Sequence, residues 1–173
     1  MHIKIEKQVQ QPPRYAVDVA PDTFDIKMIR WASMSPTKDL VVYQALGKLY
    51  LRDIKSGRVK RLTRQNDHDE FYPSFSRDGK SIAYTTWNDK DLGSVKVVSA
   101  NGGQGLTVTT EPGIYVEPKF SPKGNNIVFR RLTGGYLLSP EWSLEPGIYL
   151  ADRKAKAMEK VTEDGFNAHF AAD

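Results

Sequence analysis

The chain has 173 residues, of which 39% are hydrophobic, 27% charged and 10% aromatic, enough for a folded domain with a hydrophobic core. It has no cysteine, which excludes disulfides and thiolate metal sites, and no apolar run near the roughly 18 residues of a membrane-spanning helix. The net charge of +4 is interleaved with acidic residues, and the densest basic stretch, residues 58–64, is typical of an exposed strand. We therefore expect neither a membrane span nor a nucleic-acid partner.

Residues 1–28 lack the pattern that fills the rest of the chain. Residues 4–10 alternate weakly between apolar and polar, a Pro-Pro pair interrupts them, and residues 15–19 form a second candidate strand. The first residues contain no apolar stretch of the kind found in a signal peptide. We therefore interpret residues 1–28 as the end of a preceding repeat unit followed by a connecting strand.

One hairpin motif recurs from residue 29 onward. It is clearest at 72–84 (YPSFSRDGKSIAY) and 117–129 (EPKFSPKGNNIVF), weaker at 31–43 (WASMSPTKDLVVY), and begins again at 167–173 (NAHFAAD). In the complete copies an aromatic residue or Met precedes a serine, and a short turn then leads into a β-rich strand. The turn is built around Asp-Gly or Lys-Gly in the two clear copies. The copy at 31–43 lacks this glycine, which would supply a positive φ at low cost.

The spacing of the motif is that of propeller blades. The aligned Ser35, Ser76 and Ser121 lie 41 and 45 residues apart, within the period of four-stranded blade repeats. Two more strand candidates follow each hairpin, such as residues 48–54 and 58–63. Four antiparallel strands in each unit predict an all-β chain, a partial β-propeller of about three blades. Because a terminal blade leaves one apolar face uncovered, we expect the isolated chain to self-associate.

The repeat divides the chain into units of similar length. We place the three blades at residues 29–66, 67–110 and 111–165, and the start of a truncated fourth blade at 166–173. The third blade carries a long inserted loop, residues 131–145, between its second and third strands.

The inserted loop is the candidate docking element of the chain. It contains Tyr136, Leu138 and Trp142. Tyrosine and tryptophan combine a large apolar surface with a polar end, which suits a protein interface. These side chains either pack on their own blade or dock a partner domain, and the sequence leaves both interpretations open.

Histidines are too few for a metal-dependent catalytic site. The chain has three of them, His2, His68 and His169, and no His-x-His pair. We therefore predict no catalytic residues and no metal site in this segment. The acidic cluster at residues 67–70 precedes the inner strand of the second blade, where loops meet the channel mouth of a propeller. It is either a solvated loop or part of a site for a cation or substrate.

If that face binds a ligand, we expect six side chains to converge on it. They come from the segments that precede or begin the inner strands of the second, third and fourth units: His68, Glu70, Tyr72, Tyr115, Glu117 and His169.

The motif resembles the WD40-like PD40 repeat, which builds the six-bladed propellers of TolB-type proteins. The matching consensus is Pro-x-Phe-Ser-Pro-Asp-Gly followed by a strand and a later Leu-Thr. Longer phrases, at residues 42–50, 71–76, 85–87 and 145–149, are similar to bacterial TolB-like proteins joined to an amidohydrolase domain. This closer resemblance extends from about residue 14 to near the end of the chain.

The resemblance implies a larger protein in which the propeller precedes a metal-dependent hydrolase. The partners of this chain would then be the remaining blades and a C-terminal amidohydrolase domain, which it would scaffold while limiting substrate access. Zinc or another divalent metal would belong to that domain, and no cofactor to this segment. The protein would be periplasmic or secreted.

Two alternatives stay open at this stage. The chain would otherwise belong to a stand-alone periplasmic interaction propeller of the TolB type, or to the propeller of a serine peptidase resembling prolyl oligopeptidase. The flanking sequence distinguishes them, because a hydrolase needs clustered His and Asp residues and a serine peptidase needs a Gly-x-Ser-x-Gly motif.

Overall fold

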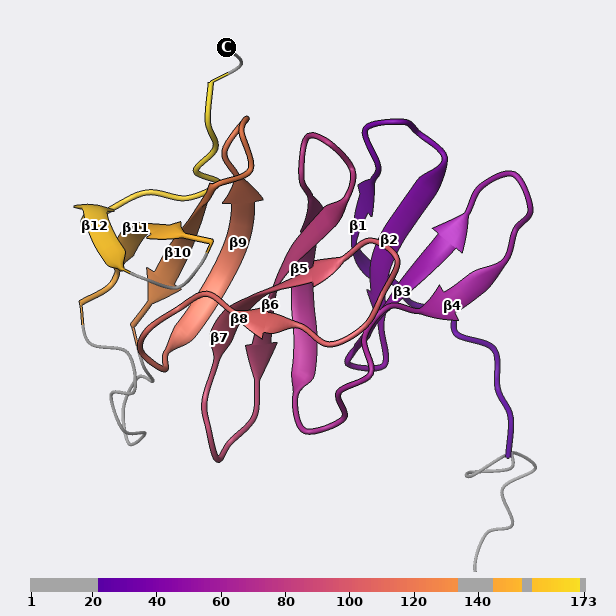
Figure 1. Cartoon of the computed structure of the whole chain (residues 1–173). Coiled ribbons are helices and arrows are strands. Elements are labelled where there is room, and N and C mark those ends of the chain that lie inside the picture. The colour runs from indigo at the N-terminus through magenta and orange to yellow at the C-terminus, as the bar shows by residue number, and fades with distance from the viewer. Residues whose placement is uncertain (1–21, 134–144, 154–156, 172–173) are drawn as a thin grey trace, which may run out of the picture.

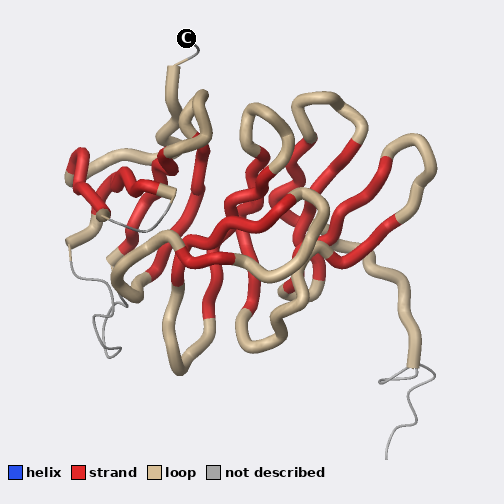
Figure 2. The backbone as a smooth tube through the Cα atoms, in the orientation of Figure 1, coloured by secondary structure: helices blue, strands red, loops and turns tan. Residues whose placement is uncertain are grey.

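The described part of the chain forms three four-stranded antiparallel sheets (Figure 1). The computed structural model describes residues 22–133, 145–153 and 157–171. Within these ranges the secondary structure consists of strands, turns and loops, as Figure 2 shows. The prediction of an all-β partial propeller is confirmed. No helix in the described ranges is long and apolar enough to cross a membrane.

Each sheet is a meander in which strands adjacent in the chain are adjacent in space. Sheet 1 contains β1 (Arg30–Met34), β2 (Leu40–Ala45), β3 (Lys48–Asp53) and β4 (Val59–Arg61). Sheet 2 contains β5 (Asp69–Phe75), β6 (Ser81–Trp87), β7 (Ser94–Ser99) and β8 (Leu106–Thr107). Sheet 3 contains β9 (Ile114–Phe120), β10 (Asn126–Leu132), β11 (Gly147–Asp152) and β12 (Met158–Thr162).

The repeated motif takes the same place in every sheet. Met34, Phe75 and Phe120 are the last residues of β1, β5 and β9. They pair with the equivalent residues of the next strands, Val41, Ile82 and Ile127. The sequence repeat is therefore a structural repeat, with one hairpin per sheet.

A serine organises each of these hairpin turns. The Oγ atoms of Ser35, Ser76 and Ser121 accept hydrogen bonds from backbone N–H groups five residues later, at 3.0, 3.0 and 3.1 Å. The fourth residue of the turn has a left-handed φ: 59° at Lys38, 70° at Gly79 and 73° at Gly124. The first turn thus keeps the geometry of the other two although lysine replaces glycine.

Two apolar clusters hold the three sheets together. Sheets 1 and 2 enclose a cluster of eight buried residues: Val42, Leu49, Leu51, Leu62, Ile82, Tyr84, Val98 and Ala100. Sheets 2 and 3 enclose a second cluster of nine: Ala83, Val95, Val97, Val108, Tyr115, Ile127, Phe129, Tyr149 and Ala151. Sheet 2 is therefore covered on both faces, as the middle blade of a propeller segment must be.

The first strand of each sheet is the innermost. β5 contacts both β1 and β9, which places the three first strands side by side, whereas the later strands lie farther out. The segment after β12 returns to the same inner edge, because Asn167 N donates to Glu117 Oε2 at 2.8 Å. Residues near 167 thus adjoin β9 from the side opposite β5. The predicted docking residues Tyr136, Leu138 and Trp142 lie outside the described residues.

Candidate functional site

A left-handed residue interrupts every inner strand at the same repeat position. The pairing register shifts between Arg30 and Ser33 in β1 and between Phe71 and Ser74 in β5, and a matching shift occurs between β9 and β10. The residues at these bulges have φ near +50°, as does their counterpart in the returning segment: Trp31 (49°), Tyr72 (51°), Glu117 (58°) and Asn167 (50°).

Such a conformation is costly for residues other than glycine. Each left-handed residue with a side chain is disfavoured by about 1 kcal/mol or more. A bulge also redirects the side chain it carries, and bulges are frequent beside functional sites. The recurrence of this strain at four equivalent positions marks the inner edge of the sheets as the candidate site.

The three bulge residues and their counterpart Asn167 line one pocket. Its volume is about 360 Å³, and Trp31, Tyr72, Glu117 and Asn167 line it. Four neighbours from the same inner strands complete the lining: Ala32, Ser33, Pro73 and Lys119. The bulges therefore direct side chains of three sheets and the returning segment into a common space.

The pocket combines aromatic rings with charged side chains. The rings of Trp31 and Tyr72 lie 4.4 Å apart at 37° across the boundary between sheets 1 and 2, and Arg30 lies 5.8 Å above the Trp31 ring. Glu117 and Lys119, both from β9, supply charges of both signs. Apolar surface combined with a few polar groups is typical of a site that binds part of a peptide or another organic ligand.

The six predicted site residues do not share one surface. Tyr72 and Glu117 line the pocket. His68 and Glu70 are buried at the boundary between sheets 1 and 2, with 5% and 0% exposure, and Tyr115 is buried between sheets 2 and 3. His169 is exposed, with Nδ1 3.0 Å from the backbone oxygen of Asn167.

Sequence reasoning missed Trp31 and Asn167 as pocket residues. Both align with Tyr72 and Glu117 in the repeat, so the repeat register itself contained the signal that could have found them. We also expected the acidic segment 67–70 to face this pocket. This does not fit the structure, in which His68 and Glu70 are buried.

Glu70 joins sheet 2 to sheet 1 from a fully buried position. Its Oε2 accepts a hydrogen bond from Leu49 N at 2.8 Å, and its own N–H donates to Gly47 O at 2.9 Å. Burial raises the pKa of this carboxyl group. Glu70 therefore fastens the turn between β2 and β3 onto the inner strand β5.

His68 lies beside Glu70 at the same boundary between sheets 1 and 2. Its Nδ1 is 2.9 Å from Asp67 Oδ1, and its Nε2 is 3.8 Å from Glu70 Oε1. Burial lowers the pKa of His68, and the nearby Lys96 adds to this effect. Lys48 Nζ donates to the backbone oxygen of His68 and lies 3.7 Å from Asp69. In the part of the chain that the structure describes, no group of three or more His, Cys, Asp or Glu side chains is placed to hold a metal ion.

The packing of the sheets defines the class of fold. Three successive four-stranded meanders, stacked through two apolar clusters with their first strands innermost, form a segment of a TolB-like β-propeller. No family model matches the chain. Similar proteins are nevertheless found in both sequence and structure.

The matching sequences are Tol-Pal system proteins TolB. The protein from Francisella tularensis subsp. mediasiatica (strain FSC147) is 29% identical over 123 residues, covering 69% of this chain and 26% of its own length. The protein from Francisella tularensis subsp. holarctica (strain OSU18) is also 29% identical, over 124 residues, covering 70% of this chain and 27% of its own length. The chain thus spans about a quarter of the length of the curated relatives it matches.

Solved structures show the same fold. TolB from Acinetobacter baumannii aligns with a TM-score of 0.61 at 22% identity, covering 78% of this chain and 32% of that one. An oligogalacturonate lyase from Vibrio parahaemolyticus aligns with a TM-score of 0.61 at 10% identity, covering 78% of this chain and 40% of that one. At these identities the likeness concerns the fold alone.

Proposed function

We propose that this chain is a non-catalytic part of a larger propeller protein, in which it scaffolds a second domain and binds a segment of it or of another protein at the inner pocket. The observation that carries the proposal is the convergence of four left-handed residues on one pocket: Trp31, Tyr72 and Glu117 at strand bulges, and Asn167 in the returning segment. Strain repeated at one place and directed into a cavity is typical of a binding surface rather than of a turn.

The outer face of sheet 1 supports the proposal that the whole protein contains further blades. Tyr43 holds the repeat position of Tyr84 and Phe129, both of which are fully buried against the preceding sheet. Tyr43 itself is half-buried and packs on Tyr50 with the ring centroids 6.0 Å apart. This face therefore carries the aromatic residue that a preceding blade would cover. In the isolated chain, we expect it to drive self-association, seen as concentration-dependent light scattering.

For the second domain, we favour a C-terminal amidohydrolase that holds zinc or another divalent metal. The phrases at residues 42–50, 71–76, 85–87 and 145–149 support this assignment through their resemblance to TolB-like amidohydrolases. The propeller would limit access of substrate to the hydrolase, with Tyr136, Leu138 and Trp142 as docking residues. The parent protein would act in the periplasm or outside the cell.

A stand-alone interaction propeller is the second candidate function. The matching sequences favour it, because they are TolB proteins of the Tol-Pal system. In this case the pocket would contact a separate protein instead of a domain of the same chain.

Photo-crosslinking from the pocket tests both candidates. A photoreactive amino acid is placed at Lys119, an exposed pocket residue, in the full-length protein. We expect crosslinks to a hydrolase domain of the same chain, and crosslinks to a separate protein if the second candidate is right. Trp31→Ala should reduce either signal by about tenfold.

The same photoreactive residue at Lys90 is the matched control, because that exposed side chain lies in the loop after β6 and outside the pocket. Crosslinking from Lys119 that does not exceed the Lys90 background would contradict the pocket as a binding site.

A further inference from the structure

The outer edge of sheet 1 is a strand with free backbone groups. β4 is the last strand of its sheet, and in the described part of the chain it pairs with β3 alone. Asp53 N donates to Arg58 O at 2.9 Å, and because an antiparallel ladder uses every second residue, residues 58, 60 and 62 direct their backbone groups towards β3. The N–H and C=O groups of Val59 and Arg61 point the other way and have no partner among the described residues. These groups are therefore available for pairing with another strand.

A groove with a volume of about 460 Å³ lies beside this strand, where sheet 1 meets the turn after β7. Its apolar lining consists of Leu40, Leu51 and Ala100, which belong to or pack against the cluster that sheets 1 and 2 share. Leu51 pairs with Lys60, so both side chains lie on the face of sheet 1 that looks towards sheet 2. The groove shares no lining residue with the inner pocket. The outer edge of sheet 1 thus combines free backbone groups with an apolar groove.

One acidic and two basic side chains line the groove, which gives it a net charge of +1. Asp53 Oδ1 accepts from Ser56 N at 2.7 Å and from Ser56 Oγ at 2.9 Å. These hydrogen bonds and the charge of Arg58 lower the pKa of Asp53, so the acid is ionised and offsets the arginine. Lys60 Nζ donates to the neutral backbone oxygen of Asn101 at 3.1 Å and forms no ion pair with a described residue. The charge that remains unopposed in the groove is therefore that of Lys60.

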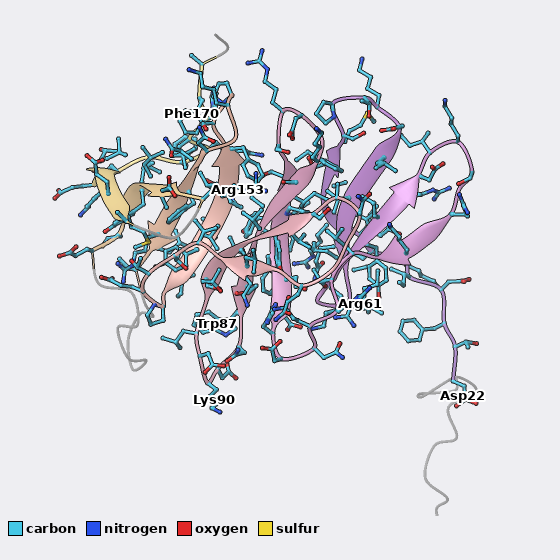
Figure 3. The ribbon with its side chains drawn as sticks, in the orientation of Figure 1. Asp22, Arg61, Trp87, Lys90, Arg153 and Phe170 are labelled. Atoms are coloured by element: carbon cyan, nitrogen blue, oxygen red, sulfur yellow. The ribbon has the colours of Figure 1, made fainter. Side chains whose placement is uncertain are left out.

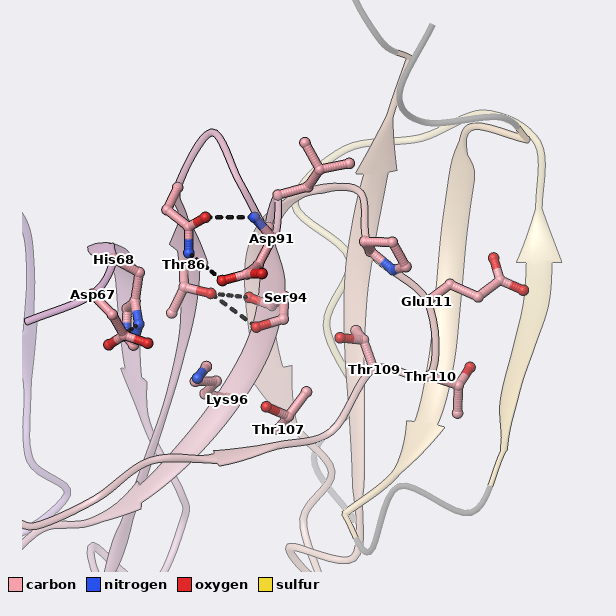
Figure 4. A pocket seen from close by; sticks show the side chains of 14 residues that line it. Asp67, His68, Thr86, Asp91, Ser94, Lys96, Thr107, Thr109, Thr110 and Glu111 are labelled. Atoms are coloured by element: carbon pink, nitrogen blue, oxygen red, sulfur yellow. Dashed lines mark hydrogen bonds and ion pairs between the residues drawn. The ribbon is translucent and has the colours of Figure 1, made fainter. Parts of the chain in front are cut away.

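The basic character of β4 is not a requirement of the fold. β8 is the matching outer strand of sheet 2, and the equivalent stretch around it, residues 104–110, carries no charge. Figure 4 shows hydroxyl side chains along this stretch, those of Thr107, Thr109 and Thr110. Residues 58–64 around β4 contain four cations and no acid: Arg58, Lys60, Arg61 and Arg64. Charge therefore distinguishes the outer strand of sheet 1 from its counterpart in sheet 2.

We propose that the edge of β4 binds an extended segment of a partner protein, which pairs with Val59 and Arg61 and carries an acidic residue two positions from an aliphatic one. An added strand satisfies the backbone groups of a sheet edge, and its alternate side chains provide specificity. Side chains two residues apart point to the same side of a strand. The aliphatic side chain enters the groove over Leu51, and the carboxylate meets the charge of Lys60.

A peptide suits this surface better than a nucleic acid does. Nucleic acids bind through several phosphate contacts, whereas the groove offers one unopposed cation and an apolar lining. The surface also stays accessible when further blades are present, because blades cover the faces of a sheet and not its outermost strand. The edge of β4 is therefore an interaction surface separate from the inner pocket.

Amide NMR of the whole chain with a short peptide tests the proposal. The probe is acetyl-Ser-Thr-Leu-Thr-Glu-Thr-Ser-amide, and its matched control has Gln in place of Glu. We expect the acidic peptide to cause saturable shifts at residues 58–62 and 100–102, and to bind about threefold more tightly than the control, which is the effect of one exposed charge pair. Lys60→Met should remove this preference, whereas Lys60→Arg should retain it. Lys90→Met should leave binding unchanged, because Figure 3 shows Lys90 in the loop after β6, far from Arg61 of β4.

A proline substitution separates strand addition from charge attraction. Val59→Pro removes an outward N–H and places a ring where the added strand lies, so it should weaken binding about tenfold. Proline is tolerated on edge strands, and Thr107→Pro, which removes an outward N–H from β8, is the matched control. If Val59→Pro fails to fold, a peptide N-methylated throughout its Leu-Thr-Glu core gives the same test, because it cannot donate hydrogen bonds to the edge.

Equal binding of the acidic and neutral peptides, or unchanged binding to a folded Val59→Pro chain, would overturn the proposal. The same holds if a short DNA duplex shifts the signals of residues 58–62 and no peptide does, since the strand would then bind a polyanion. Concentration-dependent shifts of the chain alone that Val59→Pro abolishes would identify a second copy of the chain as the occupant, and would also contradict the proposal.

Discussion

Glu70 in sheet 2 and Tyr115 in sheet 3 occupy equivalent positions, two residues before the left-handed residue of their inner strands, yet they meet the neighbouring sheet with different chemistry. Glu70 accepts a backbone hydrogen bond from Leu49 of sheet 1. Tyr115 belongs to the apolar cluster that sheet 3 shares with sheet 2, where it packs edge-on against Phe129 of its own sheet with the ring centroids 5.4 Å apart. Its hydroxyl donates to Glu111 O at 2.8 Å. The same backbone position thus holds a buried acid at one boundary and an aromatic ring at the other.

The boundary between sheets 1 and 2 also leaves more polar atoms without partners. Among the described residues, five buried side-chain atoms lack a hydrogen bond, and all of them lie in or beside this boundary: Arg61 Nε, Thr63 Oγ1, His68 Nε2, Glu70 Oε1 and Tyr84 OH. Unsatisfied buried groups cost free energy, whereas apolar packing does not incur this cost. We infer that the boundary between sheets 2 and 3 is the more stable one.

The largest expected effect comes from the aromatic core of the stronger boundary. Phe129 is fully buried in the cluster that sheets 2 and 3 enclose, and its ring packs against Tyr115 and Tyr149 of its own sheet. Phe129→Ala should lower the free energy of unfolding by about 3–5 kcal/mol, because it leaves a cavity that the rigid strands cannot fill. Denaturant unfolding measures this loss, and Phe129→Leu, which retains most of the volume, is the control. A loss below about 1 kcal/mol would show that sheets 2 and 3 do not stabilise each other through this ring.

A smaller loss is expected at the polar boundary. Glu70→Leu removes the acceptor of the Leu49 N–H and leaves that donor buried and unpaired, which should cost about 1–3 kcal/mol. Glu70→Gln keeps an acceptor oxygen and should cost less than Glu70→Leu. The denaturant midpoints of the two variants show which substitution costs more unfolding free energy. Equal losses would mean that the side chain fills space but makes no useful hydrogen bond.

Glu70 also predicts that the stability of the chain depends on pH in the acidic range. Because burial raises its pKa in the folded state, its contribution to stability is full below pH 4.5 and is lost as the pH rises through the folded pKa. Each pH unit in that interval removes up to about 1.4 kcal/mol. The pKa of His68 is lowered, so its contribution has the opposite sign: it is present above pH 6.5 and is lost as the pH falls.

Stability curves of the natural protein and of Glu70→Gln separate these two contributions. The difference in unfolding free energy should move in favour of the glutamine variant as the pH rises from 4.5. Parallel curves across this range would show that Glu70 does not titrate differently in the folded and unfolded chains.

Two tyrosine hydroxyls give a matched pair of smaller effects. Tyr84 OH is buried with no hydrogen bond, whereas Tyr115 OH donates to Glu111 O. Tyr84→Phe should be neutral or stabilising by up to about 1 kcal/mol, and Tyr115→Phe should cost about 0.5–1.5 kcal/mol. Thermal unfolding of the two variants in one buffer provides the comparison. A loss in Tyr84→Phe as large as in Tyr115→Phe would indicate that a water molecule satisfies the Tyr84 hydroxyl.

The repeat could be predicted from the sequence because each hairpin is formed by residues close together in the chain. Phe75 and Phe120, each followed by a serine and a glycine-containing turn, predict the ends of the inner strands without any knowledge of distant contacts. The sequence also predicts that sheets of this kind must stack, since one sheet cannot bury both faces.

The buried pair His68 and Glu70 and the inner pocket were harder to predict, because both depend on contacts between blades. The burial of Glu70 arises from the turn at Gly47, more than twenty residues earlier in the chain. Tyrosine and tryptophan favour extended strands, so nothing local at Tyr72 or Trp31 indicates a left-handed φ. The direction of those side chains is decided by the packing of neighbouring inner strands.

The smallest expected effect lies in the hairpin turns, where the three sheets can be compared at one position. Lys38 adopts a φ of 59° where Gly79 and Gly124 have 70° and 73°. Lys38→Gly should relieve about 1 kcal/mol of backbone strain and lose roughly half of that gain through the greater freedom of glycine in the unfolded chain. The net stabilisation of about 0.5 kcal/mol is measurable by denaturant unfolding. The reverse change, Gly79→Ala, should destabilise by about 0.5 kcal/mol, because alanine would meet the same left-handed strain, partly offset by the smaller freedom of alanine in the unfolded chain. If Lys38→Gly destabilises the chain instead, then the lysine side chain makes a contact whose value exceeds the strain, and the first turn is not a degenerate copy of the other two.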